Sequence, residues 1–178
     1  MRFIFAPLFI VLYSFVYAQV YVPVDATSKV SFKIKNFGST VDGTFKGLKG
    51  TINFDVSNLS DALFDVTINA ATIDTGIGMR DNHLRKPDYF GVANFPTIQF
   101  VSSNVEKSGK AHEAIVTAKL TIKKTTQKIS FPFRYSVANG VLKFTGEFKI
   151  NRRDFGVGGS SFNLADELTV LLDVRASR

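Results

Sequence analysis

Two histidines, His83 and His112, are the side chains in this sequence best suited to moving a proton. His83 follows Arg80 and Asp81 in an irregular segment, whereas His112 lies in a polar stretch typical of a solvated loop. The Asp-x-His spacing, together with Ser102 and Ser103, raises the question of a Ser-His-Asp hydrolase. No Gly-x-Ser-x-Gly nucleophile turn occurs, so structural hydrogen bonding is the favoured role of His83.

The other residue types that could bind a metal or a cofactor show no pattern typical of such a site. Two histidines and no cysteine give no recognisable metal-ligand spacing. The lack of cysteine also removes thiolate nucleophiles and disulfide bonds. No glycine-rich, phosphate-cradling loop precedes a helix. We therefore expect no catalytic residues, no metal and no cofactor, and we expect that the protein is not an enzyme.

Two charged clusters in the sequence are the other candidates for a functional site. The first is Arg80-Asp81 with His83, and the second is Arg152-Arg153-Asp154. Each places arginine beside aspartate at an expected strand end, where a bidentate arginine–carboxylate pair would hold a loop in place. The functional alternative is a polar rim that grips a ligand headgroup while an apolar interior takes its tail.

Period-two alternation of apolar and polar residues dominates the rest of the chain and predicts strands nearly everywhere. The alternating runs lie at 30–35, 52–56, 64–70, 98–100, 114–121, 129–133, 142–150 and 168–174. Turn signals separate them at 36–38, 49–50, 57–58, 108–109, 139–140 and 158–159. Asn139-Gly140 is the strongest hairpin signal. Between Met79 and Gly91 the alternation stops, and a short helix is expected to start at Asp81 and end before Pro87.

Short antiparallel strands of this kind predict an all-β sandwich or a closed barrel. About eight strands make a barrel whose interior is either filled by side chains or holds one small ligand. Eighteen phenylalanines and no tryptophan fit both interiors, because rings can plug a core or line a tunnel. Glycines inside or beside the strand runs indicate bends, bulges or close ligand approach. The residues alone leave the filled and hollow barrels open.

The first 18 residues predict a cleaved signal peptide, because a positive start precedes a short apolar run that ends in small residues. Residues 19–178 then form one domain, which we expect to be periplasmic or secreted. The formal net charge of +7 is spread along the chain without long basic tracts. This charge favours solubility and transient contact with a membrane surface, and we expect no nucleic-acid partner.

Ordered sequence blocks run across nearly the whole chain, at Asp25–Phe32, Gly43–Ile52, Ile73–Gly76, Arg80–Leu84, Asp88–Phe90, Phe95–Phe100, Leu120–Ile122 and Ile150–Gly156. In this order they resemble the YceI-like family, whose members are lipocalin-like proteins associated with polyisoprenoids and other long amphiphilic ligands. The sequence departs from the family pattern at Tyr21–Val24, at Asn36 in place of a common histidine, and at Lys124 in place of a frequent glycine.

The resemblance implies a lipocalin-like antiparallel β-barrel of about eight strands in a single domain, with a short helical segment near residues 80–90 and a hollow interior. It implies storage or transport of a polyisoprenoid, isoprenoid quinone or fatty-acid-like lipid. Arg80, Asp81 and His83 would shape the mouth of the tunnel. An enzyme that acts on a lipid through His83, a protein-interaction module and a homodimer stay open as alternatives. The tunnel would be lined by Phe32, Phe45, Phe54, Ile68, Phe100, Leu120, Phe144 and Phe148.

Overall fold

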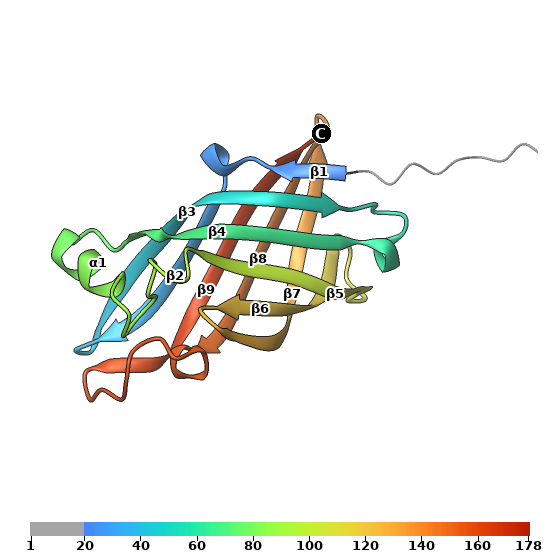
Figure 1. Cartoon of the computed structure of the whole chain (residues 1–178). Helices are drawn as coiled ribbons and strands as arrows, with labels where there is room; N and C mark the ends of the chain where they lie inside the picture. The colour runs from blue at the N-terminus through green and yellow to red at the C-terminus, as the bar shows by residue number, and fades with distance from the viewer. Residues whose placement is uncertain (1–19) are drawn as a thin grey trace, which may run out of the picture.

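The computed structural model describes residues 20–178, and the predicted signal peptide at residues 1–18 lies outside the described residues. Figure 1 shows long strands wrapped around a common interior, with one short helix, α1 (Gly78–Leu84), at one end. The strands are β1 (Val20–Pro23), β2 (Lys29–Asn36), β3 (Ser39–Asn53), β4 (Leu63–Asp74), β5 (Thr97–Lys107), β6 (Glu113–Ile122), β7 (Thr125–Ala138), β8 (Val141–Asn151) and β9 (Leu164–Ser177). Short 3-10 turns lie at η1 (Asp25–Thr27), η2 (Leu59–Asp61) and η3 (Arg152–Phe155).

The sheet closes on itself. Strands β2 to β9 pair antiparallel with their sequence neighbours, and β2 pairs with β9 to complete a ring of eight. The short β1 lies beyond the N-terminal end of β2, where Val20 pairs with Asn53 of β3 and Val22 with Ser177 of β9. Within residues 20–178, closure leaves no long sheet edge exposed. The predicted all-β barrel of about eight strands with one short helix is therefore confirmed.

Three two-residue turns set the register of the long hairpins. They are Phe37-Gly38, Lys123-Lys124 and Asn139-Gly140, each flanked by directly paired strand residues. The first residue of each turn has a positive φ, between 48° and 55°. Such left-handed turns match the twist of the flanking strands, and asparagine or glycine adopts them most easily. The turn at Lys123 was not predicted, because lysine carries no turn signal.

The predicted turn at Lys49-Gly50 is wrong, since β3 runs through it to Asn53. The register between β3 and β4 shifts twice between Thr44 and Lys49, and Gly50 has a φ of 133°. A Cβ atom on Gly50 would lie 2.1 Å from the carbonyl oxygen of Asp65. The glycine therefore permits a close backbone approach beside a β-bulge, which bends the strand without ending it.

The helix also differs from its predicted bounds, because it starts at Gly78 and ends at Leu84. Asp81 was expected to begin it, but the Asp81 carboxylate accepts hydrogen bonds from Thr75, which lies outside the helix. Its side chain therefore joins the helix to the end of β4 and caps no helical N–H group. No helix among residues 20–178 combines the length and apolarity that a bilayer crossing requires.

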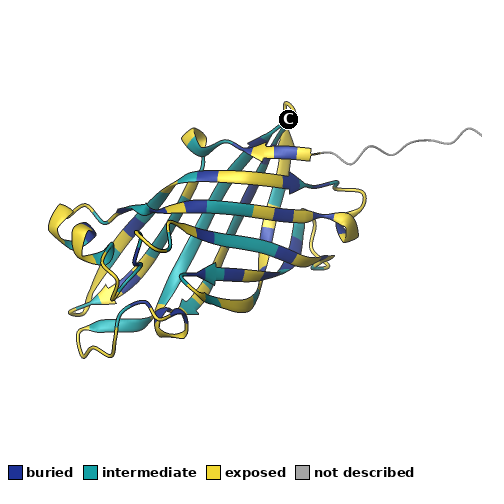
Figure 2. Ribbon diagram, in the orientation of Figure 1, coloured by how far each residue is buried: buried dark blue, intermediate teal, exposed yellow. Residues whose placement is uncertain are grey.

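The interior is filled at one end of the barrel. Figure 2 shows buried and exposed residues alternating along β3 and β4, as strands with one inward face require. At the end away from α1, the rings of Phe54, Phe64, Phe133 and Phe144 pack in edge-to-face and tilted pairs, with centroids 5.0–6.2 Å apart. Tyr21 of β1 joins the same core cluster. These rings close that end of the barrel.

Candidate functional site: an apolar cavity under the helical segment

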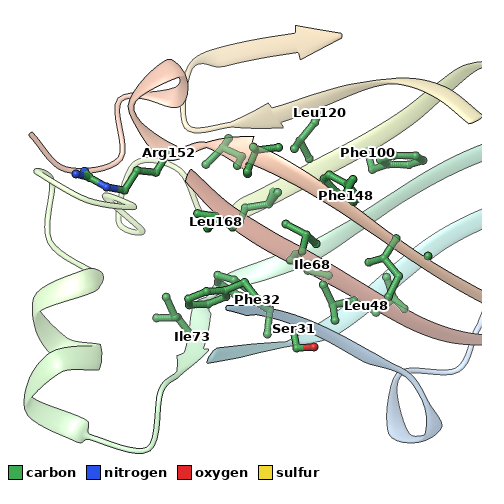
Figure 3. Close-up of a pocket in the computed structure, with 18 of the residues that line it drawn as sticks. Ser31, Phe32, Leu48, Ile68, Ile73, Phe100, Leu120, Phe148, Arg152 and Leu168 are labelled. Atoms are coloured by element: carbon green, nitrogen blue, oxygen red, sulfur yellow. The ribbon is translucent and has the colours of Figure 1, made fainter. Parts of the chain in front are cut away.

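A cavity of about 240 Å³ occupies the other part of the barrel, between the ring cluster and α1. Its wall draws on every strand from β2 to β9 and on the segment around α1. Figure 3 shows apolar side chains from opposite walls pointing into the same space, with Phe100 deep in the barrel and Ile73 beside α1. The apolar lining includes Ile34, Leu48, Ile68, Ile73, Ile98, Phe100, Leu120, Phe148, Leu168, Val170 and Leu172.

Aromatic rings stiffen two sides of this cavity. Phe45 contacts Phe32 and Phe90, with ring centroids 5.8 and 5.5 Å apart. On the other side Phe131 stacks on Phe148 at 4.4 Å. Rings packed against one another restrict each other's positions, so these contacts favour a defined shape for the two sides of the cavity.

The two charged residues of the lining, Arg80 and Arg152, lie at its α1 end, which we call the mouth. Thr75, after β4, accepts a hydrogen bond at Oγ1 from Arg80 Nε (2.7 Å) and donates from the same oxygen to Asp81 Oδ1 (2.5 Å). Arg80 Nη2 also donates to the Thr75 carbonyl oxygen at 2.7 Å. Asp81 is buried, and Arg80 lines the cavity. The expected Arg80–Asp81 ion pair does not form, because both side chains bind Thr75.

Arg152 holds the opposite side of the mouth. Its side chain is 3% exposed and donates to the carbonyl oxygens of Val157 and Ala165 and to the carboxylate of Asp166 at 2.8–2.9 Å. Its partner is thus Asp166 of β9, and not the adjacent Asp154 that the sequence suggested. In Figure 3 the guanidinium group points away from the cavity, so Arg152 contributes the aliphatic part of its chain to the lining.

Two further cations hold the helical segment against the barrel. Arg85 donates to the carbonyl oxygens of Ala71 and Ile73 at 2.8 and 2.9 Å, which ties the end of α1 to β4. Lys123 donates to the carbonyl oxygens of Pro87 and Gly156. These contacts place Leu84 and Tyr89 on the cavity wall.

At the same end of the barrel, Lys149 of β8 donates a hydrogen bond to Glu167 of β9, and this hydrogen bond raises the pKa of Lys149.

The eight apolar residues predicted to line a tunnel do not all lie in one place. Seven of them line the cavity, and they are Phe32, Phe45, Ile68, Phe100, Leu120, Phe144 and Phe148. Phe54 does not line it, because its ring is 1% exposed among Phe64, Tyr135 and Phe144 in the ring cluster. The interior is therefore partly filled and partly hollow.

The three polar residues predicted at the mouth point in different directions. Arg80 faces the cavity, Asp81 is turned to Thr75, and His83 is exposed with its ring 4.9 Å from that of Tyr89. Neither Asp81 nor His83 lines the cavity. Among residues 20–178 no group of three or more His, Cys, Asp or Glu side chains is placed to hold a metal ion.

Sequence reasoning missed several lining residues. Leu168, Val170 and Leu172 belong to the last alternating run, whose inward face carried the signal for them. Tyr89 and Leu84 come from the irregular segment, where no periodicity indicates direction. Arg152 was recognised as part of a charged cluster but not as a wall of the cavity.

A closed eight-stranded antiparallel barrel with an apolar cavity under a helical segment is the architecture of lipocalin-like proteins. The YceI-like domain model matches residues 21–176, and the chain therefore belongs to the YceI-like family. The YceI protein of Salmonella arizonae is 32% identical over 152 residues, which cover 82% of this chain and 78% of that protein. The resemblance seen in the sequence is confirmed.

Solved structures share the fold. The crystal structure of BcnA from Burkholderia cenocepacia superposes with a TM-score of 0.82 at 28% identity, covering 87% of this chain and 99% of that one. A polyisoprenoid-binding domain from Saccharophagus degradans, implicated in plant cell wall breakdown, gives a TM-score of 0.71 at 16% identity over 88% of this chain and 97% of that one. At that identity the second likeness concerns the fold alone.

Proposed function

We propose that this protein binds one long-chain amphiphile, such as an isoprenoid or another lipid, and carries or stores it without transforming it. The cavity wall supports this most directly. From Phe133 and Phe144 of the ring cluster to Ile34 and Ile73 near the mouth, its residues are overwhelmingly apolar. Burying a hydrocarbon chain in such a space favours binding by about 0.8 kcal/mol for each CH₂ removed from water.

The mouth supports the amphiphilic part of the proposal. Arg80 uses Nε and Nη2 to bind Thr75, and no carboxylate within residues 20–178 forms an ion pair with it. A guanidinium group with donors to spare at the edge of an apolar cavity favours an acidic or strongly polar headgroup. The tail would lie among the rings, and the headgroup would lie near Arg80.

The relatives and the sequence start support the class of ligand and the compartment. The chain belongs to the YceI-like family, and the Saccharophagus degradans domain of the same fold is a polyisoprenoid-binding domain. The signal-like residues 1–18 favour export, so the proposed site of action is the periplasm or the exterior of the cell.

Native mass spectrometry of the purified protein, followed by organic extraction, tests the proposal. We expect a stoichiometric long-chain species that leaves with the organic phase, and the same spectrum reports whether the protein is a monomer or a homodimer. Protein that is consistently empty, and that also takes up no added isoprenoid alcohol or fatty acid, would contradict it.

Neighbouring positions on β6 provide a matched pair of variants. Leu120 is buried and lines the cavity, while Lys119 is exposed on the outer face. Leu120→Trp should fill part of the cavity and lower lipid occupancy, because the added ring takes the volume that the tail needs. Lys119→Trp adds the same ring outside and should keep normal occupancy. Equal occupancy in the two variants would place the ligand elsewhere.

A further inference from the structure

Three large apolar side chains project into solvent around the mouth. Phe37, Met79 and Phe162 are 74%, 85% and 109% exposed, whereas every other exposed large apolar residue in the described chain is at most 53% exposed. Single apolar residues are common on protein surfaces. It is unusual, however, that the three most exposed ones all lie at the same end of the molecule. We call Phe37, Met79 and Phe162 the apolar tips.

The apolar tips come from three separate segments. Phe37 forms the β2–β3 turn, Met79 lies in the first turn of α1, and Phe162 lies in the loop between η3 and β9. Each is one or two residues from a cavity-lining residue, namely Asn36, Arg80 and Leu164. The Phe37 N–H donates to the carbonyl oxygen of Asn163 at 2.7 Å, which joins two of the loops. Figure 1 shows the three segments at the same end of the barrel.

The backbone conformation at Phe37 is one that favours a different residue type. It is the first residue of a two-residue turn, with a φ of 48°. Bulky L-residues adopt this left-handed conformation with difficulty, whereas asparagine suits it. At the other end of the barrel the equivalent turn is Asn139-Gly140, with φ values of 51° and 77°. The ring of Phe37 is therefore neither buried within its own chain nor suited to its turn, as is expected of a side chain that contacts a partner outside the chain.

Basic side chains accompany the tips. Lys35, Lys86 and Lys124 are exposed, and within residues 20–178 none of them has a carboxylate within 4 Å. Lys35 is next to the lining residue Asn36, Lys86 follows α1, and Lys124 is in the turn whose Lys123 binds Pro87. Lysines around projecting apolar side chains match an anionic lipid surface, where the rings enter the interface and the ammonium groups meet headgroups.

We propose that the apolar tips and these lysines dock the mouth of the barrel onto an anionic lipid bilayer, so that a lipid passes between membrane and cavity without crossing water. The docking itself goes beyond lipid binding and does not depend on which ligand occupies the cavity. A second protein copy is the less favoured partner, because glycines and serines flank the tips and a packed subunit interface needs a contiguous apolar core. Gly38, Gly78, Gly159, Ser160 and Ser161 are such neighbours.

Co-sedimentation with vesicles tests the docking surface. The purified protein is mixed with vesicles of phosphatidylglycerol and phosphatidylcholine in equal parts, or of phosphatidylcholine alone. The triple variant Phe37→Asn, Met79→Gln, Phe162→Ser removes the tips, and Phe37→Asn should also ease the turn. The matched control, Val56→Ser, Leu63→Ser, Val137→Ser, removes three half-exposed apolar residues away from the mouth. Denaturant unfolding shows that each variant is folded.

We expect the wild type to bind the anionic vesicles, the tip variant to bind about tenfold more weakly, and the control to match the wild type. Replacing the three lysines by glutamine should weaken binding to anionic vesicles only. Docking is overturned if the wild type does not sediment with anionic vesicles, or if removing the tips changes nothing. It is equally overturned if the wild type is a dimer that the tip variant converts to monomers, because the tips are then a subunit interface.

Uptake of a water-soluble short-chain isoprenoid, measured without vesicles, separates this inference from the proposed function. The tip variant should take up the soluble probe as the wild type does, since its cavity is unchanged. Normal uptake without vesicle binding refutes the docking alone. Vesicle binding without uptake refutes the lipid cavity and leaves the docking surface standing.

Discussion

The ring of Phe32 lies over the backbone of Gly43, its cross-strand partner in β3, so closely that a Cβ atom at position 43 would stand 2.2 Å from Cζ of Phe32. Phe32 lines the cavity and also contacts Phe45. The missing side chain at Gly43 therefore leaves the space that the tip of the Phe32 ring occupies.

Gly43→Ala should displace the Phe32 ring into the cavity. We expect a loss of about 1–3 kcal/mol in the free energy of unfolding, together with weaker lipid uptake, because the ring leaves its packed position and occupies ligand space. Urea denaturation and a lipid-uptake assay measure the two effects. In the background of Phe32→Ala the same substitution should cost little, and an undiminished cost there would show that the ring is not the cause.

Phe54 and Phe32 should respond differently to truncation. Phe54 is 1% exposed among other rings, so Phe54→Ala should lower the free energy of unfolding by about 3–5 kcal/mol. Phe32 borders open space, so Phe32→Ala should cost about 1–2 kcal/mol. Urea denaturation of both variants checks the order. Equal costs would mean that the closed end is packed no better than the cavity wall.

The alternating pattern predicted the strands because it records which face of each strand points inward. It does not record depth along the barrel axis. Phe32 and Phe54 both occupy inward positions of alternating runs, yet one lines the cavity and the other plugs the closed end. Which rings meet is decided by register and by the two shifts between β3 and β4, and these depend on backbone geometry more than on residue type.

The mouth was harder to predict for a different reason. Arg80, Asp81 and His83 are close in sequence, but successive residues of a helix point in different directions, so only Arg80 reaches the cavity. The partner of Arg152 lies at Asp166, on the strand that returns after an irregular loop. Local sequence favoured the nearer Asp154, and nothing in the spacing indicated the longer connection.

Arg152 should act as the anchor of the loop between η3 and β9. Arg152→Met keeps the apolar stem but removes the donor to the carbonyl oxygens of Val157 and Ala165 and to Oδ1 of Asp166, whose Oδ2 still pairs with Arg153. We expect a loss of roughly 2–4 kcal/mol in the free energy of unfolding and faster amide exchange over residues 157–165. Arg153→Met, which removes the exposed partner of Asp166, is the control and should change little. Amide exchange that stays slow in Arg152→Met would exclude the anchoring role.

His83 tests the enzyme alternative directly. Its ring is exposed against Tyr89 and does not line the cavity, so a substrate buried among the apolar side chains would not meet it. A general base must come within about 2.6–3.2 Å of the proton that it removes. His83→Ala should therefore leave lipid uptake and the chemical identity of the extracted ligand unchanged. Mass spectrometry of lipid incubated with the wild type and with His83→Ala makes the comparison. A product that appears only with the wild type would establish proton-transfer chemistry at His83 and replace the carrier by an enzyme.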